Sequence, residues 1–159
     1  MTSLDHPGID RVAKALQAAG HPGRIRMLPD ACRTAAEAAA AIGCAVEQIA
    51  KSIIFRVGSG RAVLVVTSGG NRVVEQKIVA ALDGEALGKA DAAFVREMTG
   101  FAIGGVAPVG HLQPPIVFID RDLSRHDEIW AAAGHPHAVF PLAFDDLVRL
   151  TGGAVIAVS

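Results

Sequence analysis

Apolar residues fill most positions of two neighbouring stretches, 51–57 and 62–67, which read Lys-Ser-Ile-Ile-Phe-Arg-Val and Ala-Val-Leu-Val-Val-Thr. Runs of this length and composition are typical of strands, and the glycine-containing linker at 58–61 predicts an antiparallel hairpin. Because both runs stay apolar over most of their length, we expect the hairpin at the centre of a sheet. Further short strands or extended segments are predicted at 25–28, 116–119, 137–141 and 154–158.

Helical spacing of apolar residues accounts for most of the remaining chain. Thr34 and Glu37 form a capping-box pair before an alanine-rich helix that ends at Gly43, and Asp91 is placed to cap a helix to about Met98. The pattern predicts one mixed α/β domain over residues 1–159, with antiparallel pairing at its centre and helices outside. The other helical segments are expected at 9–19, 46–50, 74–82, 127–133 and 144–150.

Composition narrows the class of protein. The chain has 159 residues, of which 51% are hydrophobic and 19% charged, so it is expected to fold into a packed core. A formal net charge of −1 argues against a protein that coats nucleic acids, although it is compatible with one that grips only an RNA end. No apolar run approaches the roughly 20 residues of a membrane span, and residues 1–8 lack a signal-peptide pattern. We therefore expect a cytoplasmic protein without a membrane or DNA partner.

The segment 99–111 is the most unusual stretch, since it contains four glycines and Pro108. Glycine allows positive φ and close approach of other groups to the backbone, while proline fixes φ and removes a donor. Such a loop can direct several backbone N–H groups at one point. It is either a ligand site or a tight connection.

Lys51 is the first candidate for chemistry. It begins an otherwise apolar strand, where an ordinary lysine would lie with its stem along apolar surface. The functional alternative is an ammonium at a pocket rim that binds a carbonyl oxygen or a phosphate. The turn 68–72 (Ser-Gly-Gly-Asn-Arg) can hold an anion at a helix N-terminus, but it lacks the P-loop pattern, and a plain turn is favoured.

Other constellations are weaker. His111, His135 and His137 suggest a metal site, yet no His-Glu-x-x-His motif or nearby cysteine supports it, so we expect neither a metal nor a cofactor. A catalytic triad through a serine lacks the Gly-x-Ser-x-Gly elbow. Asp120, at the end of a buried strand, can orient a neighbour or cap the following turn, and capping is favoured.

Three segments, 51–55, 65–71 and 99–111, resemble the YbaK/prolyl-tRNA-synthetase-associated (ProX-type) family of aminoacyl-tRNA deacylases. Its members are freestanding relatives of the editing domain of bacterial prolyl-tRNA synthetase. The resemblance implies a mixed, partly antiparallel, barrel-like central sheet surrounded by helices. It also implies a trans-editing enzyme, which hydrolyses the ester of an amino acid wrongly attached to a tRNA.

The same resemblance implies roles for particular residues. Lys51 matches the hallmark functional lysine, and the Gly104-x-x-x-Pro108 loop matches the wall of the aminoacyl pocket. The backbone N–H groups of Gly104 and Gly105 would stabilise the oxyanion. The residues expected to contact the substrate are Ser52, Ser68, Gly69, Phe101, Ile103, Val106, Pro108, Gly110, His111 and His137.

The implied substrate is a small mischarged amino acid (alanine, cysteine or a serine-like residue) on the acceptor end of a tRNA, tRNA(Pro) in particular. Ser52 stands where the alanine-editing branch carries asparagine, so the amino acid stays open. Prolyl-tRNA synthetase is an implied partner. The alternative is a non-catalytic module of the same fold that binds a tRNA end or the synthetase.

Overall fold

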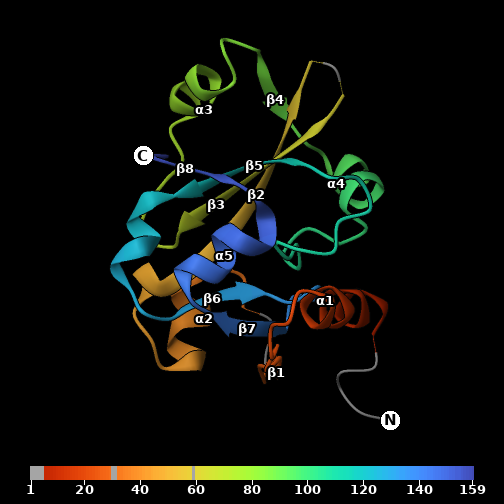
Figure 1. Cartoon of the computed structure of the whole chain (residues 1–159), viewed down its shortest axis with the longest axis vertical. Coiled ribbons are helices and arrows are strands. Elements are labelled where there is room, and N and C mark those ends of the chain that lie inside the picture. Colours follow the sequence, from red (N-terminus) through yellow and green to blue (C-terminus); the bar gives the residue numbers. More distant parts are fainter. Residues whose placement is uncertain (1–5, 30–31, 59) are drawn as a thin grey trace.

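A mixed eight-stranded sheet runs through the computed structural model, which describes residues 6–29, 32–58 and 60–159 (Figure 1). The strands are β1 (Arg26–Met27), β2 (Ile49–Val57), β3 (Ala62–Ser68), β4 (Leu87–Lys89), β5 (Ile116–Asp120), β6 (Ile129–Ala132), β7 (Ala138–Leu142) and β8 (Ala154–Ile156). They follow the order β1-β7-β6-β2-β3-β5-β8, and β4 pairs with β2 off this path. The predicted mixed α/β class is confirmed. Among the described residues β1 and β8 are not paired with each other, so closure into a barrel stays a prediction.

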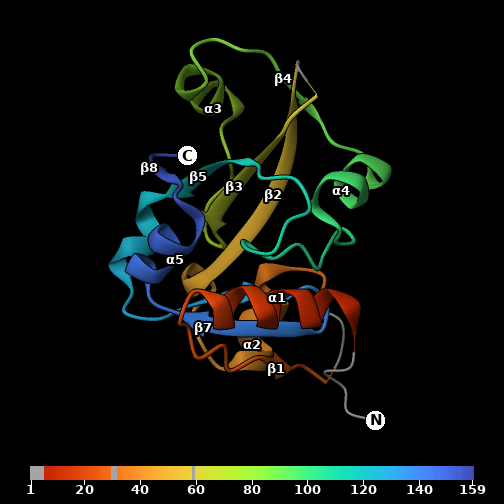
Figure 2. The ribbon, with the colours of Figure 1, turned by 45° about the vertical axis from the view of Figure 1, so that its right-hand side comes forward.

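Helices surround the sheet. They are α1 (Pro7–Ala18), α2 (Ala35–Ile42), α3 (Glu75–Ala81), α4 (Ala92–Thr99) and α5 (Phe144–Thr151), with 3-10 turns η1 (Val46–Gln48) and η2 (Arg121–Arg125). In both views α1 lies beside β7 at one end of the molecule, and α3 lies at the other end with β4 (Figures 1 and 2). Within the described residues, no helix is long and apolar enough to cross a membrane.

The β2–β3 hairpin is central, as predicted. The two strands pair antiparallel from Ala50 opposite Ser68 to Arg56 opposite Ala62, and every residue of β3 is buried. β2 also pairs with β6 in parallel and with β4 antiparallel, so it has neighbours on both edges. Alternate β3 residues face two separate cores, Leu64 the larger one and Val65 the smaller one beside α3.

Local capping signals place the helix ends. The Thr34 hydroxyl accepts a hydrogen bond from the Glu37 N–H at 3.1 Å, and Gly43 ends α2 in the left-handed region with φ of 89°. The Asp91 carboxylate accepts from the Phe94 N–H at 2.8 Å at the start of α4. These side-chain contacts satisfy donors that a helix leaves unpaired at its N-terminus. Both predicted caps are confirmed.

The predicted helix at 127–133 is wrong, because this segment contains strand β6. Trp130 pairs with Ile49 of β2 on one side and with Pro141 of β7 on the other. Burial alternates along β6, with Ile129 and Ala131 fully buried, as a strand requires. Alanine favours helix in isolation, but two neighbouring strands supply the ladder partners here. The sequence pattern does not predict β4 either. The helical turn expected at 46–50 ends at Gln48, and β2 begins at the next residue, Ile49.

Asp120 performs both of the roles considered for it. Its Oδ1 accepts from the Asp122 N–H at 2.9 Å and so caps η2. Its Oδ2 accepts from Thr67 Oγ1 at 3.1 Å, from the Ser68 N–H at 2.9 Å and from Asn71 Nδ2 at 2.9 Å. The carboxylate is 1% exposed, and it ties the end of β3 to the end of β5.

We expect Asp120→Ala to lower the free energy of unfolding by about 2–4 kcal/mol, because it leaves buried donors without an acceptor. Urea unfolding measures this change. Asp127→Ala is the matched control, since Asp127 is exposed, and its effect should stay within about 0.5 kcal/mol. Equal unfolding midpoints for the two variants would contradict a stabilising network around Asp120.

Candidate functional site

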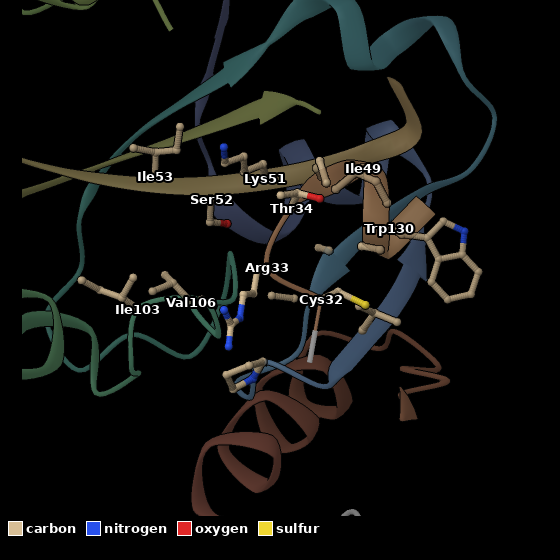
Figure 3. A pocket seen from close by; sticks show the side chains of 18 of the residues that line it. Cys32, Arg33, Thr34, Ile49, Lys51, Ser52, Ile53, Ile103, Val106 and Trp130 are labelled. Carbon is tan, nitrogen blue, oxygen red and sulfur yellow. The ribbon is translucent and has the colours of Figure 1, made fainter. Parts of the chain in front are cut away.

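A pocket of about 390 Å³ lies between β2, the loop after α4 and the segment that leads into α2 (Figure 3). Residues 130–132 of β6 and residues of β7 complete its wall. The lining is mainly small and apolar, and its alanines come from five elements or connections: Ala35, Ala38, Ala50, Ala90, Ala131, Ala132 and Ala138. The pocket therefore suits a compact apolar group.

Lys51 and Ser52 are neighbours on β2, and their side chains leave opposite sides of the strand (Figure 3). Lys51 is exposed and contributes to the pocket rim. Ser52 points toward Arg33 and Val106, and its Oγ is buried without a hydrogen-bond partner among the described residues. A buried hydroxyl in this state costs free energy unless a ligand or water bonds to it. Ser52 therefore offers a polar contact inside an otherwise apolar pocket.

One side chain of α1 holds both ends of the 99–111 loop. Arg11 Nε donates to the Gly110 carbonyl at 2.7 Å, and its Nη2 donates to the Thr99 carbonyl at 3.0 Å. The guanidinium also lies 4.3 Å from the centroid of the Phe101 ring, within cation–π range. Burial lowers the pKa of Arg11 from its ordinary value. The pocket wall formed by this loop is thus fixed from outside the pocket.

Gly104 and Gly105 have different surroundings. Gly104 lines the pocket in the left-handed region, with φ of 94°. Gly105 packs on the backbone of His135, where an added Cβ would lie 2.9 Å from the His135 Cα. Its N–H donates to the Ala102 carbonyl at 3.0 Å, and the predicted role of this N–H toward an oxyanion stays a prediction. The role of Gly104 stays a prediction.

His111 is the last residue of the loop and is not part of the pocket lining. Its Nε2 hydrogen-bonds the Ala107 carbonyl at 2.6 Å, and its ring meets the Phe101 ring edge-on at 5.6 Å between centroids. Desolvation by burial lowers the pKa of His111. The bond to Ala107 acts in the opposite direction, and the nearby Arg11 charge lowers it further. The His111 ring therefore connects the end of the loop to Ala107 and Phe101 within it.

The structure brings Lys51, Ser52, Ile103, Gly104 and Val106 together around the pocket. It places the other predicted contacts outside the lining, and their proposed contact with substrate stays untested. These are Ser68, Gly69, Gly105, Phe101, Pro108, Gly110, His111 and His137.

Two of the residues outside the lining have evident structural uses. The Ser68 hydroxyl donates to the Glu47 carbonyl at 2.8 Å, next to the start of β2. Gly69 lies so close to η1 that an added Cβ would come within 2.5 Å of the Val46 carbonyl oxygen. The turn after β3 is thus packed against η1, in agreement with the plain turn favoured from the sequence.

Three imidazoles gather beside the pocket. The rings of His6 and His135 lie 4.8 Å apart, and those of His135 and His137 lie 5.1 Å apart. Burial, followed by the charges of His6 and His137, lowers the pKa of His135. Among the described residues no group of three or more histidine, cysteine, aspartate or glutamate side chains can hold a metal ion. Pro136, between two of these histidines, reaches the pocket wall.

The sequence alone did not point to Arg33, Thr34 or Trp130, although all three line the pocket. The capping pattern predicts only a helix start at Thr34. The arginine directly before it is the one feature of the sequence that points to a basic residue at this wall of the pocket. The helix predicted at 127–133 gives no reason to expect Trp130 in the pocket, whereas strand β6 brings it to the pocket edge (Figure 3).

The fold and the site define a mixed α/β domain with a small, mainly apolar pocket that has Lys51 at its rim. Residues 29–150 match the model of the aminoacyl-tRNA editing domain, so the chain belongs to this family. It is 32% identical over 114 residues to the uncharacterized protein YwhH of Bacillus subtilis (strain 168), and the alignment covers 72% of each chain.

Two solved structures are similar over almost their whole length. One is a proposed trans-editing enzyme for prolyl tRNA synthetase, with a TM-score of 0.90, 42% identity and coverage of 97% of this chain and 98% of that one. The other is the hypothetical protein APE2540, with a TM-score of 0.85, 30% identity and coverage of 93% and 98%. The resemblance inferred from the three sequence segments is confirmed.

We expect Arg11→Ala to lower the free energy of unfolding by about 2–3 kcal/mol, because two charge-assisted hydrogen bonds and a cation–π contact are lost. Amide hydrogen exchange in residues 100–110 should accelerate more than exchange in β3. Lys14→Ala on the same helix is the control, since Lys14 forms only an exposed pair with Asp10. Unchanged loop exchange in Arg11→Ala would show that the loop does not depend on this side chain.

We also expect stability to fall as the pH drops below about 6.5, the ordinary pKa of histidine. The folded-state pKa of His111 is lowered, so the unfolded chain binds more protons in this range and unfolding becomes easier. Urea unfolding between about pH 5 and pH 7 gives the free energy of unfolding at each pH. This free energy should depend less steeply on pH in His111→Gln than in the wild type. His135, whose pKa is also lowered, adds a drop of the same sign that the His111→Gln variant keeps. An unaltered slope in His111→Gln would refute the assignment.

Proposed function

We propose that the protein is a trans-editing deacylase, which hydrolyses the ester between a small mischarged amino acid and a tRNA. The observation that carries this proposal is an alanine-lined pocket with Lys51 at its rim, in a member of the aminoacyl-tRNA editing domain family. We propose alanine, cysteine or a serine-like residue as the amino acid. A structural relative is described as a trans-editing enzyme for prolyl tRNA synthetase, which supports tRNA(Pro) as substrate and that synthetase as partner.

The size of the pocket supports a small substrate side chain. About 390 Å³ lies in the range of pockets that enclose whole small ligands, so there is room for an aminoacyl group and part of the terminal nucleoside. The alanine walls exclude bulk without adding polar contacts. Steric exclusion of this kind is the logic of a second sieve, which admits residues that are too small for the synthetase to reject.

The lining also limits the chemistry. Among the described residues of the pocket wall, none is aspartate, glutamate or histidine, so no side chain there is an evident general base. An aminoacyl ester is already activated, and we propose that water attacks it with help from a ribose hydroxyl of the substrate. The Lys51 ammonium and the Gly104 N–H would stabilise the charge that develops on the carbonyl oxygen.

The lack of a general base favours a second candidate as well. A non-catalytic module with the same pocket would bind the tRNA end or the synthetase without turnover. The two candidates differ in one measurable property, the release of amino acid from mischarged tRNA.

We expect the wild-type protein to release amino acid from at least one member of a panel of alanyl-, cysteinyl- and seryl-tRNA(Pro). Lys51→Ala should reduce the rate constant by roughly 100-fold or more, the usual effect of removing one group that stabilises an oxyanion. Lys89→Ala is the matched control, because Lys89 is an exposed lysine on β4 outside the pocket. Full activity of Lys51→Ala would reject this mechanism, and no release by the wild type would favour the non-catalytic module.

A further inference from the structure

The charge of the pocket differs from that of the chain. The protein carries a formal net charge of −1, but the charged residues in the pocket lining are Arg33 and Lys51, both positive. In the part of the chain that the structure describes, no carboxylate lines the pocket. Two cations beside apolar walls attract an anion more strongly than they would in open water.

Arg33 occupies a distinct place in this pocket. It directly precedes Thr34, the N-cap of α2, and Figure 3 shows its guanidinium between Ser52 and the loop that carries Val106. No salt bridge to Arg33 occurs among the described residues, although Asp122 and Asp146 have arginine partners. Its side chain is exposed, so it is not needed to hold the core. An arginine of this kind is available to a ligand.

Two further groups turn toward the same space. Ser52 Oγ is buried without a hydrogen-bond partner in the described chain and points to Arg33 (Figure 3). Ala35, the first residue of α2, also lines the pocket, so the positive end of that helix borders it. The guanidinium and the unpaired hydroxyl are hydrogen-bond donors beside a helix N-terminus, and among the described residues no carboxylate lines the pocket to accept from them.

We propose that Arg33 and Ser52 form a phosphate subsite, which binds the phosphodiester next to the terminal nucleoside of an RNA. The planar guanidinium can donate two parallel hydrogen bonds to phosphate oxygens, and the serine hydroxyl can donate a third. The subsite rests on the proposed function, since it places the terminal nucleoside inside the pocket with its aminoacyl ester toward the loop wall at Gly104. It gives the pocket two ends, one cationic and one apolar.

The test measures equilibrium binding of an uncharged RNA hairpin that ends in CCA, at one fixed salt concentration. A second hairpin carries a neutral methylphosphonate in place of the last phosphodiester. The wild type should bind the normal hairpin about 10-fold more tightly than the neutral one, as expected for loss of a charge-assisted hydrogen bond. Arg33→Gln should weaken binding of the normal hairpin by a similar factor and should bind both hairpins equally.

Controls separate the subsite from general charge effects. Arg61→Gln removes the same charge from the turn of the β2–β3 hairpin, outside the pocket lining, and should keep the wild-type preference. Arg33→Lys should recover part of the preference, because it restores the charge but not the paired donors. Ser52→Ala should show a smaller loss than Arg33→Gln.

Three results would overturn the subsite: no binding of the normal hairpin by the wild type, an equal loss on both hairpins in Arg33→Gln, or displacement of the RNA by equimolar inorganic phosphate. The last result would identify free phosphate as the ligand. Because the hairpin carries no amino acid, binding and hydrolysis are separate measurements. Deacylation without the Arg33–phosphate coupling rejects the subsite alone, and coupling without deacylation rejects the proposed enzyme alone.

Discussion

The contact between Arg11 and the 99–111 loop is the interaction on which the pocket depends. This loop has no regular secondary structure over most of its length, so few ladder hydrogen bonds hold it. Arg11 bonds the carbonyls of Thr99 and Gly110, close to the two ends of the loop, and covers the Phe101 ring between them. A single rigid guanidinium thus ties the end of α4 to the far end of the loop.

Close backbone packing fixes the middle of the same loop. Gly105 rests on the backbone of His135, so the loop after α4 lies against the turn between β6 and β7. That turn also meets α1, because a Cβ on Gly134 would lie 2.3 Å from the Gly8 carbonyl oxygen. Side chains larger than hydrogen would separate these segments. The pocket wall is therefore set by glycine at the points of contact, while Arg11 holds the ends.

The sequence predicted the features that depend on neighbouring residues. The β2–β3 hairpin and the caps at Thr34 and Asp91 follow from short-range patterns, and the structure contains all of them. β6 could not be predicted in this way, because its strand conformation comes from β2 and β7, which lie far away in the chain. The family resemblance identified the loop wall, but no pattern in the sequence brings Arg33 or Trp130 to the same cavity.

The alternation of side chains along β2 explains how two adjacent polar residues contribute to the site in different ways. Successive residues of a strand face opposite sides, so Lys51 and Ser52 serve different surroundings although they are adjacent in sequence. The Ser52 hydroxyl enters the cavity. The Lys51 ammonium stays at the solvent-exposed rim, where it keeps most of its water and its desolvation cost is small. The chain has a net charge of −1, and the positive charges of the described pocket lining are those of Lys51 and Arg33, so long-range attraction to a nucleic-acid backbone is weak. An anionic ligand at this site would then be held by short-range contacts inside the cavity, where Arg33 lies next to apolar walls.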